Sequence, residues 1–145
     1  MNVETSVEKA IQERFRSVFD ENLQTNVPLT RFTSARVGGP ADLFVTARNA
    51  TQLQTAVEMA YHLGLPYFVL GGGSNVLVAD AGIRGLVVHN RARSVRFRNT
   101  GASVVCTVES GANLSSLARQ CIAKGLGGLE WAVGVPGTIG GAVVG

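Results

Sequence analysis

The sequence centres on Leu70-Gly71-Gly72-Gly73-Ser74-Asn75, a glycine-rich stretch between two apolar runs at residues 66–70 and 76–78. Consecutive glycines weaken a strand, because each costs backbone entropy and provides no side chain to pack. They permit positive φ and close approach instead, and successive exposed N–H groups form a concavity that suits phosphate. The hydroxyl of Ser74 and the amide of Asn75 can also bond phosphate oxygens. Taken alone, the stretch is equally compatible with a bare tight turn.

A second glycine-rich stretch occupies residues 127–145 and shifts the balance towards anion binding. Its glycines are too frequent for the interior of a strand or a helix. Pro136 indicates a turn, Thr138 is a candidate cap, and Gly140-Gly141 precede an apolar run, which together predict a loop running into a helix. We expect the N-terminus of that helix to offer free N–H groups and a partial positive charge to a phosphate.

The first 90 residues predict a β-α-β-β unit behind an amphipathic helix. That helix covers residues 5–23, begins with a cap at Thr5, and carries Val7, Ala10, Ile11, Phe15, Val18 and Phe19 on its apolar face. An irregular connection follows over residues 28–42. The later elements are a strand at 43–46, a helix from Thr51 to Gly64 that buries Leu53, Ala56, Val57, Ala60 and Tyr61, and strands at 66–70, 76–78 and 85–88. This order favours α/β or α+β layers.

From residue 91 the pattern changes to a hairpin followed by a helix. Apolar and charged residues alternate around Val95 and Phe97, Asn99-Thr100-Gly101 makes the turn, and residues 103–109 form the return strand. The helix is capped by Asn113, ends at Gly125, and buries Leu114, Leu117, Ala118, Cys121 and Ile122. We therefore expect an N-terminal helix in residues 1–27, a first unit in residues 28–90 and a second unit in residues 91–145.

Composition places the chain among globular proteins. Of its 145 residues 46% are hydrophobic, and 13 basic against 10 acidic residues give a formal charge of +3. Aromatic residues make up only 6% and no long Lys/Arg run exists, which excludes a nucleic-acid-binding signature. No apolar stretch approaches the roughly 20 residues that span a bilayer, and the N-terminus lacks a signal-peptide pattern. We expect a cytoplasmic protein without nucleic-acid or membrane partners.

Few side chains suggest covalent or metal chemistry. Cys106 falls in an alternating strand and Cys121 on an apolar helix face, so both are interpreted as reduced core residues. His62 and His89 are far apart in sequence and have no neighbouring acid or cysteine arranged as a metal site. We therefore expect no metal centre and no catalytic triad.

Two charged features have competing interpretations. Five arginines cluster in sequence: Arg84, Arg91, Arg93, Arg96 and Arg98. Solvated strand edges explain them better than a patch for an anionic ligand. Glu130 is the one acid beside the second glycine-rich stretch, but a catalytic acid needs a tuned pKa and reach to the reacting atom. We interpret it as a structural residue that caps or pairs within its loop.

Four motifs in order resemble one enzyme family. They are Gly38-Gly39-Pro40-Ala41-Asp42, Leu70-Gly71-Gly72-Gly73-Ser74-Asn75-Val76-Leu77-Val78, Gly128-Leu129-Glu130 and Val135-Pro136-Gly137-Thr138-Ile139-Gly140-Gly141-Ala142. Together they closely resemble the UDP-N-acetylenolpyruvoylglucosamine reductases (UDP-N-acetylmuramate dehydrogenases), flavoenzymes of bacterial peptidoglycan synthesis. Each motif alone is common, whereas four in order from about residue 28 to the last residue are specific. The leading helix resembles the shorter class of this enzyme.

The resemblance implies an α+β fold of the vanillyl-alcohol-oxidase (PCMH) type, with FAD between two small subdomains, the second incomplete here. The family's pyrophosphate loop corresponds to Leu70, Gly71, Gly72, Gly73, Ser74, Asn75 and Val76. The segment that lines FAD from the second subdomain corresponds to Gly134, Pro136, Gly137, Thr138, Gly140, Gly141 and Ala142. A Rossmann fold is not indicated, because no G-x-G-x-x-G opens a helix after the first strand.

The reaction that the resemblance implies passes hydride from NADPH to FAD, and then to the enolpyruvyl double bond of UDP-N-acetylglucosamine enolpyruvate. The product is UDP-N-acetylmuramate. The family's proton-donating serine, catalytic arginine and late glutamate correspond to positions after Gly145, so no catalytic residue is expected in this chain. The substrate domain is expected to be absent too. The resemblance thus implies the FAD-binding part of a full-length enzyme that we expect to be monomeric.

Two alternatives stay open. One is another FAD oxidoreductase on the same fold, such as an oxidase of sugars or lactones, which commonly tethers FAD through a histidine or cysteine near the pyrophosphate loop. The neighbourhood of Gly71–Asn75 holds no such residue, with His62 and His89 outside the loop, which weakens that alternative. The other is a non-enzymatic nucleotide-binding module that uses this loop alone.

Overall fold

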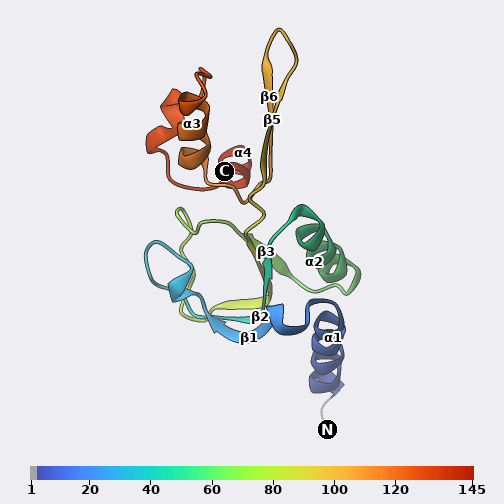
Figure 1. Cartoon of the computed structure of the whole chain (residues 1–145). Helices are drawn as coiled ribbons and strands as arrows, with labels where there is room; N and C mark the ends of the chain where they lie inside the picture. Colours follow the sequence, from blue (N-terminus) through green and yellow to red (C-terminus); the bar gives the residue numbers. More distant parts are fainter. Residues whose placement is uncertain (1–2) are drawn as a thin grey trace.

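Two units are joined by a short extended connection at residues 91–94 in the computed structural model, which describes residues 3–145, with side chains from residue 8 onward. Figure 1 shows a sheet with two helices in one unit and a hairpin with short helices in the other. This arrangement confirms the predicted α+β class. Among the described residues, none of the helices combines the length and the hydropathy needed to cross a bilayer.

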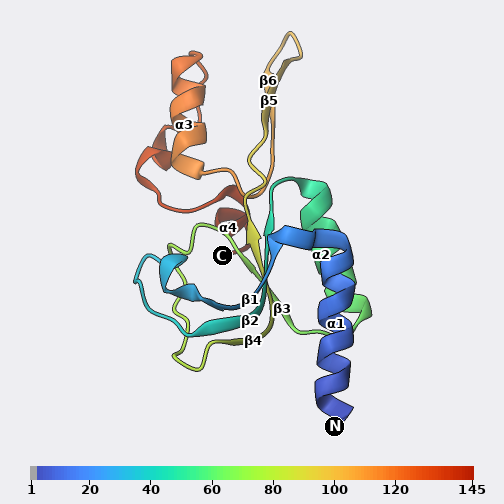
Figure 2. The same cartoon turned by 60° about the horizontal axis from the view of Figure 1, so that its bottom comes forward.

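The first unit is built on a four-stranded mixed sheet. Its order is β1 (Leu23–Pro28), β2 (Pro40–Ala47), β4 (Ile83–Asn90) and β3 (Tyr67–Leu70). β1 is antiparallel to β2, while β4 is parallel to both β2 and β3. Parallel strands need a crossover connection, and a helix supplies it between β2 and β3. Figure 2 shows β1, β2 and β4 side by side, next to α1.

The crossover helix is α2 (Ala50–His62), and its start shows why it begins where it does. The side chain of Asn49 accepts a hydrogen bond of 2.9 Å from the N–H of Gln52, as a helix N-cap does. The predicted cap at Thr51 is therefore wrong by two residues. At the other end, Gly64 adopts φ +63°, which confirms the predicted glycine stop.

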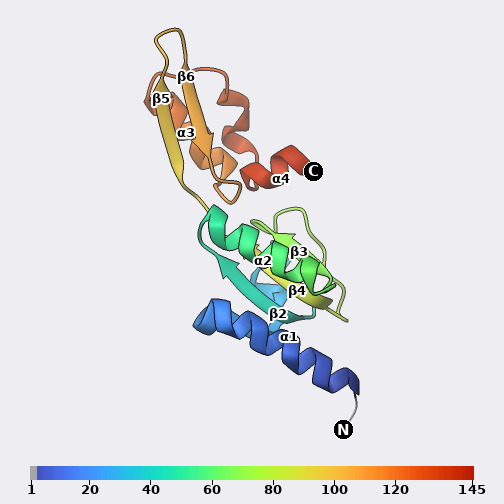
Figure 3. The same ribbon diagram turned by 90° about the vertical axis from the view of Figure 1, so that its right-hand side faces the viewer.

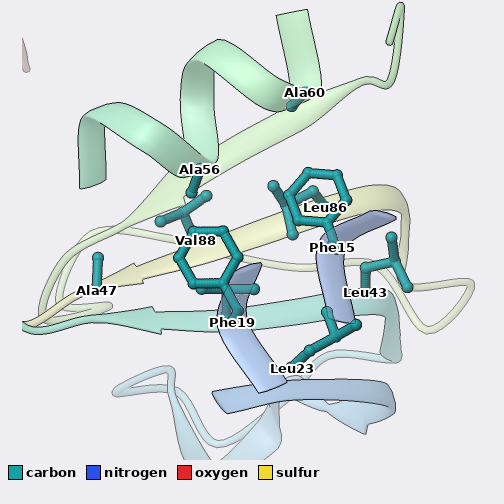
Figure 4. Packing of buried hydrophobic residues seen from close by; sticks show 10 residues of the cluster. Phe15, Phe19, Leu23, Leu43, Ala47, Ala56, Ala60, Leu86 and Val88 are labelled. Atoms are coloured by element: carbon teal, nitrogen blue, oxygen red, sulfur yellow. The ribbon is translucent and has the colours of Figure 1, made fainter. Parts of the chain in front are cut away.

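Both long helices cover one face of the sheet and form the main core. Figure 4 shows Phe15 and Phe19 of α1 (Val3–Phe19) and the alanines of α2 meeting side chains of β2 and β4. The residues involved are Phe15, Phe19, Leu23, Leu43, Val45, Ala47, Ala56, Ala60, Leu86 and Val88. Successive strand residues point to opposite faces of the sheet. A second buried cluster, which includes Phe44, Leu70 and Val87, therefore packs beneath irregular segments on the other face.

Three of the predicted apolar positions on α1 and α2 are wrong. Val18 on α1 is 52% exposed and Tyr61 on α2 is 74% exposed. Ala10 is exposed as well. The predicted cap at Thr5 concerns a side chain outside the described residues.

Two predicted elements differ from the structure. The N-terminal helix ends at Phe19 rather than at residue 23, because Asp20 turns the chain with φ +43° and Leu23–Pro28 pairs with β2 as β1. Residues 76–78 form no strand. They belong to the long loop between β3 and β4, in which Val78 is buried while Leu77 is 82% exposed.

The second unit follows the predicted order closely. It contains the hairpin of β5 (Val95–Asn99) and β6 (Val104–Val108), then α3 (Leu114–Ala123), the 3₁₀ helix η3 (Glu130–Gly134) and α4 (Ile139–Val144). Thr100 closes the hairpin turn by donating its N–H to Ser103 O at 2.8 Å. In Figure 3 the hairpin and α3 rise together from the end of the sheet. On α3, Leu114, Leu117, Ala118 and Cys121 are buried as predicted, whereas Ile122 is 48% exposed.

Candidate cofactor site

The glycine loop begins directly after β3, at the end of the sheet that faces the second unit. Gly73 has φ +65°, and a Cβ there would lie 1.9 Å from Phe32 O. The N–H of Ser34 donates to Gly73 O at 2.9 Å. Glycine is therefore required at position 73, because the loop backbone packs directly on the backbone of residues 32–34.

The loop also meets the second glycine-rich stretch. A Cβ on Gly71 would lie 2.6 Å from Thr138 Oγ1. One on Gly72 would find nothing nearer than 3.5 Å, with the Cα of Gly137 at 4.0 Å. The structure thus brings together the two stretches that the sequence separates, and a Cβ at Gly72 would make only ordinary van der Waals contacts.

Backbone N–H groups of the loop are available to a ligand. Within the part of the chain that the structure describes, the N–H groups of residues 72–75 donate no hydrogen bond to another residue. Unpaired backbone donors need a partner from water or a ligand. Successive donors of this kind form a concavity in which a phosphate can be held without any charged side chain.

The helix α4 differs from the expectation. Its first N–H groups are not free: Ile139 donates to Ala112 O at 2.9 Å and Gly140 to Ser110 O at 2.8 Å. Gly141 donates to Thr138 Oγ1 at 3.3 Å, which confirms Thr138 as the cap. The predicted open helix N-terminus is therefore wrong.

Other N–H groups remain in the second stretch. Those of Gly137 and Thr138 donate no hydrogen bond within the described chain, and both residues lie next to Gly71 and Gly72. Anion donors on this side therefore come from the loop ahead of α4.

The remaining predicted site residues differ in their surroundings. Leu70 is 1% exposed and Val76 packs against the same core, so their side chains face away from solvent. Gly140 lies against Ser110, where a Cβ would come within 3.0 Å of the serine Cβ. The others, Ser74, Asn75, Gly134, Pro136 and Ala142, are exposed.

A histidine lies beside the loop, contrary to the sequence interpretation. The parallel register pairs Leu70 with His89, and a cavity of about 310 Å³ is lined by His89 together with Gly71 and Gly72. The His89 ring packs at 5.1 Å from that of Phe32. Burial, reinforced by the nearby arginine charges, lowers the pKa of His89 to about 4, so the imidazole is neutral at pH 7.

A second, larger cleft lies where the two units meet. It has a volume of about 790 Å³, and its lining includes the arginines Arg48, Arg91, Arg93 and Arg96 together with Glu109. Glu109 accepts hydrogen bonds from Ala50 N at 2.9 Å and Ser94 N at 2.7 Å. These bonds hold the pKa of the Glu109 carboxyl below its usual value. No sequence motif indicated this carboxylate, because its partners lie far apart along the chain.

The clustered arginines have different surroundings. Arg84 pairs with Asp42 at 2.9 Å on the surface, as a solvated strand edge would. Arg91 and Arg93 line both cavities and Arg96 lines the larger one. Arg91, Arg93 and Arg96 are exposed, so they are accessible both to solvent and to an anionic ligand.

Glu130 and the two cysteines line neither cavity. Glu130 accepts a hydrogen bond of 2.7 Å from Gly128 N, and bonds from its own N–H and from Gly128 lower the pKa of its carboxyl, which supports a structural role within the loop. Cys106 is half-buried and Cys121 is buried, both as free thiols. Among the described residues, no group of His, Cys, Asp and Glu could hold a metal ion.

Comparison with known proteins assigns the fold to a family. The family model described as "FAD binding domain" matches residues 41–145. The chain is 42% identical over 135 residues to the UDP-N-acetylenolpyruvoylglucosamine reductase of Clostridium novyi, covering 92% of this chain and 43% of that protein. It is 47% identical over 121 residues to the reductase of Moorella thermoacetica, covering 83% of this chain and 39% of that protein. The chain thus spans about two-fifths of the length of these curated relatives.

Solved structures agree with this assignment. The UDP-N-acetylenolpyruvylglucosamine reductase (MurB) of Thermus caldophilus matches 81% of this chain and 40% of that chain, with a TM-score of 0.61 and 32% identity. p-Cresol methylhydroxylase matches 83% of this chain and 25% of that chain at a TM-score of 0.55 and 16% identity, which shows a shared fold. These matches confirm the fold that the resemblance implied. The chain is similar to UDP-N-acetylenolpyruvoylglucosamine reductases and has FAD as its cofactor. It belongs to the FAD binding domain family.

Proposed function

We propose that this chain is the FAD-binding portion of an NADPH-dependent reductase that converts UDP-N-acetylglucosamine enolpyruvate to UDP-N-acetylmuramate in peptidoglycan synthesis. One observation carries the proposal: two glycine-rich stretches meet with unpaired N–H groups on both, in a chain whose relatives carry that reductase name. The division at residues 27 and 90, the monomeric full-length state and the cytoplasmic location stay predictions from the sequence.

The residues present fit the diphosphate of FAD. In the proposed arrangement the N–H groups of residues 72–75 and of Gly137 and Thr138 hold its oxygens. The loop is fixed by the contact between Gly73 and Phe32, so these donors need little rearrangement on binding. Gly72 leaves the space that the phosphates require, because only hydrogen stands where other residues carry Cβ.

Bound FAD would supply hydride chemistry, taking hydride from NADPH and giving it to the enolpyruvyl double bond. The described residues of this chain bind and orient, and none is suited to donate the accompanying proton. Ser115 donates its hydroxyl to Val133 O, and Cys121 is buried in the second unit. We therefore assign proton donation and substrate binding to the remainder of the full-length protein, as the resemblance implied.

The test uses the open position in the loop. We expect Gly72→Val to abolish FAD retention and leave the secondary structure intact, because its Cβ meets only ordinary contacts and φ there is not positive. Fluorescence titration of FAD, together with circular dichroism, measures both effects.

Two further variants serve as comparisons. Ala102→Val adds similar bulk at the exposed hairpin tip, where FAD affinity should not change. Gly73→Ala should instead destabilise the fold by about 1–3 kcal/mol, because its Cβ collides with Phe32 O at positive φ. Normal flavin binding by folded Gly72→Val would contradict the proposed phosphate site.

A further inference from the structure

Three arginines line the smaller cavity, next to the open side of the glycine loop. They are Arg31, Arg91 and Arg93, and the cavity also touches Gly71 and Gly72. Its lining residues include no carboxylate. Arg31 comes from the 3₁₀ turn η2 (Leu29–Arg31), whereas the other two follow β4, so separate segments bring the guanidinium groups to one cavity.

Within the described residues, Arg31, Arg91 and Arg93 form no ion pair with an acidic side chain. The ion pair found among residues 8–145 joins Arg84 to Asp42, away from this cavity. Burial lowers the pKa of Arg93, and the charge of Arg91 lowers it further. Both charges also act on His89, whose pKa falls to about 4, so the histidine adds no positive charge of its own at pH 7.

We propose that Arg31, Arg91 and Arg93 bind the diphosphate of FAD and make the site selective for diphosphate-bearing ligands. This inference rests on the proposed function. The backbone donors at residues 72–75 are neutral and no lysine lies in the loop, so the two negative charges of a diphosphate otherwise have no counter-charge there. Guanidinium groups suit this task because they bind phosphate oxygens in a bidentate manner and stay protonated at physiological pH.

The larger cleft is the competing location for an anion, since Arg91 and Arg93 border both cavities. There the carboxylate of Glu109 lies among the arginines and offsets part of their charge. The smaller cavity has no carboxylate in its lining, adds the guanidinium group of Arg31 and meets the unpaired loop N–H groups, which favours it as the diphosphate site. Arg31 lines only the smaller cavity and Arg96 only the larger one, so these two residues distinguish the locations.

The experiment measures dissociation constants of the 145-residue protein for FAD, ADP and riboflavin, with Arg31→Gln, Arg93→Gln and the matched control Arg96→Gln. We expect Arg31→Gln and Arg93→Gln to weaken FAD and ADP by about tenfold or more, the scale of one lost charge-assisted hydrogen bond. Riboflavin, which carries no phosphate, should bind these variants as it binds the parent protein. Arg96→Gln should leave all three affinities within about twofold, and added salt should weaken FAD binding less in Arg31→Gln than in the parent.

The outcomes separate this inference from the proposed function. If Arg31→Gln and Arg93→Gln bind FAD as the parent does while Gly72→Val loses it, the arginine assignment is wrong and the loop assignment stands. Loss of affinity in Arg96→Gln alone would move the anion to the larger cleft and overturn the inference. If the parent protein binds no FAD but binds ADP through Arg31, the diphosphate site stands and the flavin assignment fails. If neither FAD nor ADP binds, the diphosphate site and the proposed function both fail. The substituted residues Arg31, Arg93 and Arg96 are exposed, so the melting temperatures of the three variants should equal that of the parent protein.

Discussion

At the scale of single residues, three adjacent glycines serve three different purposes. Gly71 makes room for Thr138, Gly73 packs on Phe32 O, and Gly72 is exposed with only ordinary contacts. A sequence alone shows a run of identical residues, because the neighbours that distinguish them lie far away along the chain. Only Gly72 combines an open surrounding with a tolerant backbone conformation, which makes it the informative position for ligand binding.

His89 provides a prediction about pH at the same scale. Its pKa of about 4 in the folded protein lies below the ordinary value of 6.5, so the unfolded chain binds the proton first as pH falls. The contribution to stability is complete above pH 6.5 and is lost progressively as pH falls towards 4. Urea unfolding at several pH values should therefore show stability falling across this window.

The matched variants are His89→Gln and His62→Gln. His89→Gln should flatten the fall in unfolding free energy between pH 6.5 and 4, because glutamine does not titrate. His62 lies exposed at the end of α2, so its replacement should leave the profile unchanged. An undiminished slope in His89→Gln would mean that other groups cause the pH dependence.

At the scale of elements, the wrong predictions share one cause: strands are decided by pairing with distant segments, which a single sequence does not show. The sequence predicts no strand over residues 23–28, because the predicted helix runs to residue 23 and an irregular connection begins at residue 28. Pairing decides otherwise, since Leu23 aligns with Val45 and Val27 with Ala41 on β2. Residues 76–78 have strand-forming side chains but no strand partner, and they remain a loop.

The docking of α1 is testable through its buried face. Phe15 is fully buried against the sheet, and Phe15→Ala should lower the free energy of unfolding by about 3–5 kcal/mol through lost contacts and the cavity left behind. Val18 is 52% exposed on the same helix, so Val18→Ala should cost less than about 1 kcal/mol. Chemical denaturation monitored by circular dichroism gives both values. Equal effects would contradict the packing of α1 on the sheet.

At the scale of the whole molecule, the sequence identified the backbone part of the candidate site and missed its side chains. Glycine motifs are local, so both stretches and the cap at Thr138 could be recognised from residue order. The placement of His89 beside Gly71 depends on the parallel register of β3 and β4. The bridge of Glu109 to Ala50 and Ser94 depends on how the two units meet. Such contacts between distant segments leave no pattern in a single sequence.

The isolated chain should bind FAD weakly and show no NADPH-dependent reduction of UDP-N-acetylglucosamine enolpyruvate. Hydride transfer needs the substrate double bond held against the flavin and a proton donor on its other side. Neither Ser115 nor Cys121 suits this role, since Ser115 is bonded to Val133 and Cys121 is buried. Following NADPH absorbance with added FAD and substrate tests this, with a full-length relative as the positive control. Turnover above background would reveal catalytic groups within these 145 residues.

The unpaired N–H groups of the glycine loop have a consequence for mutational robustness. Every residue except proline carries the same backbone donor, so exchanging the side chain of Ser74 or Asn75 deletes none of the donors at those positions. Substitutions can abolish the proposed phosphate site by adding a side chain at a glycine or by removing a backbone N–H with proline. The backbone positions vulnerable to random mutation are therefore few and close together.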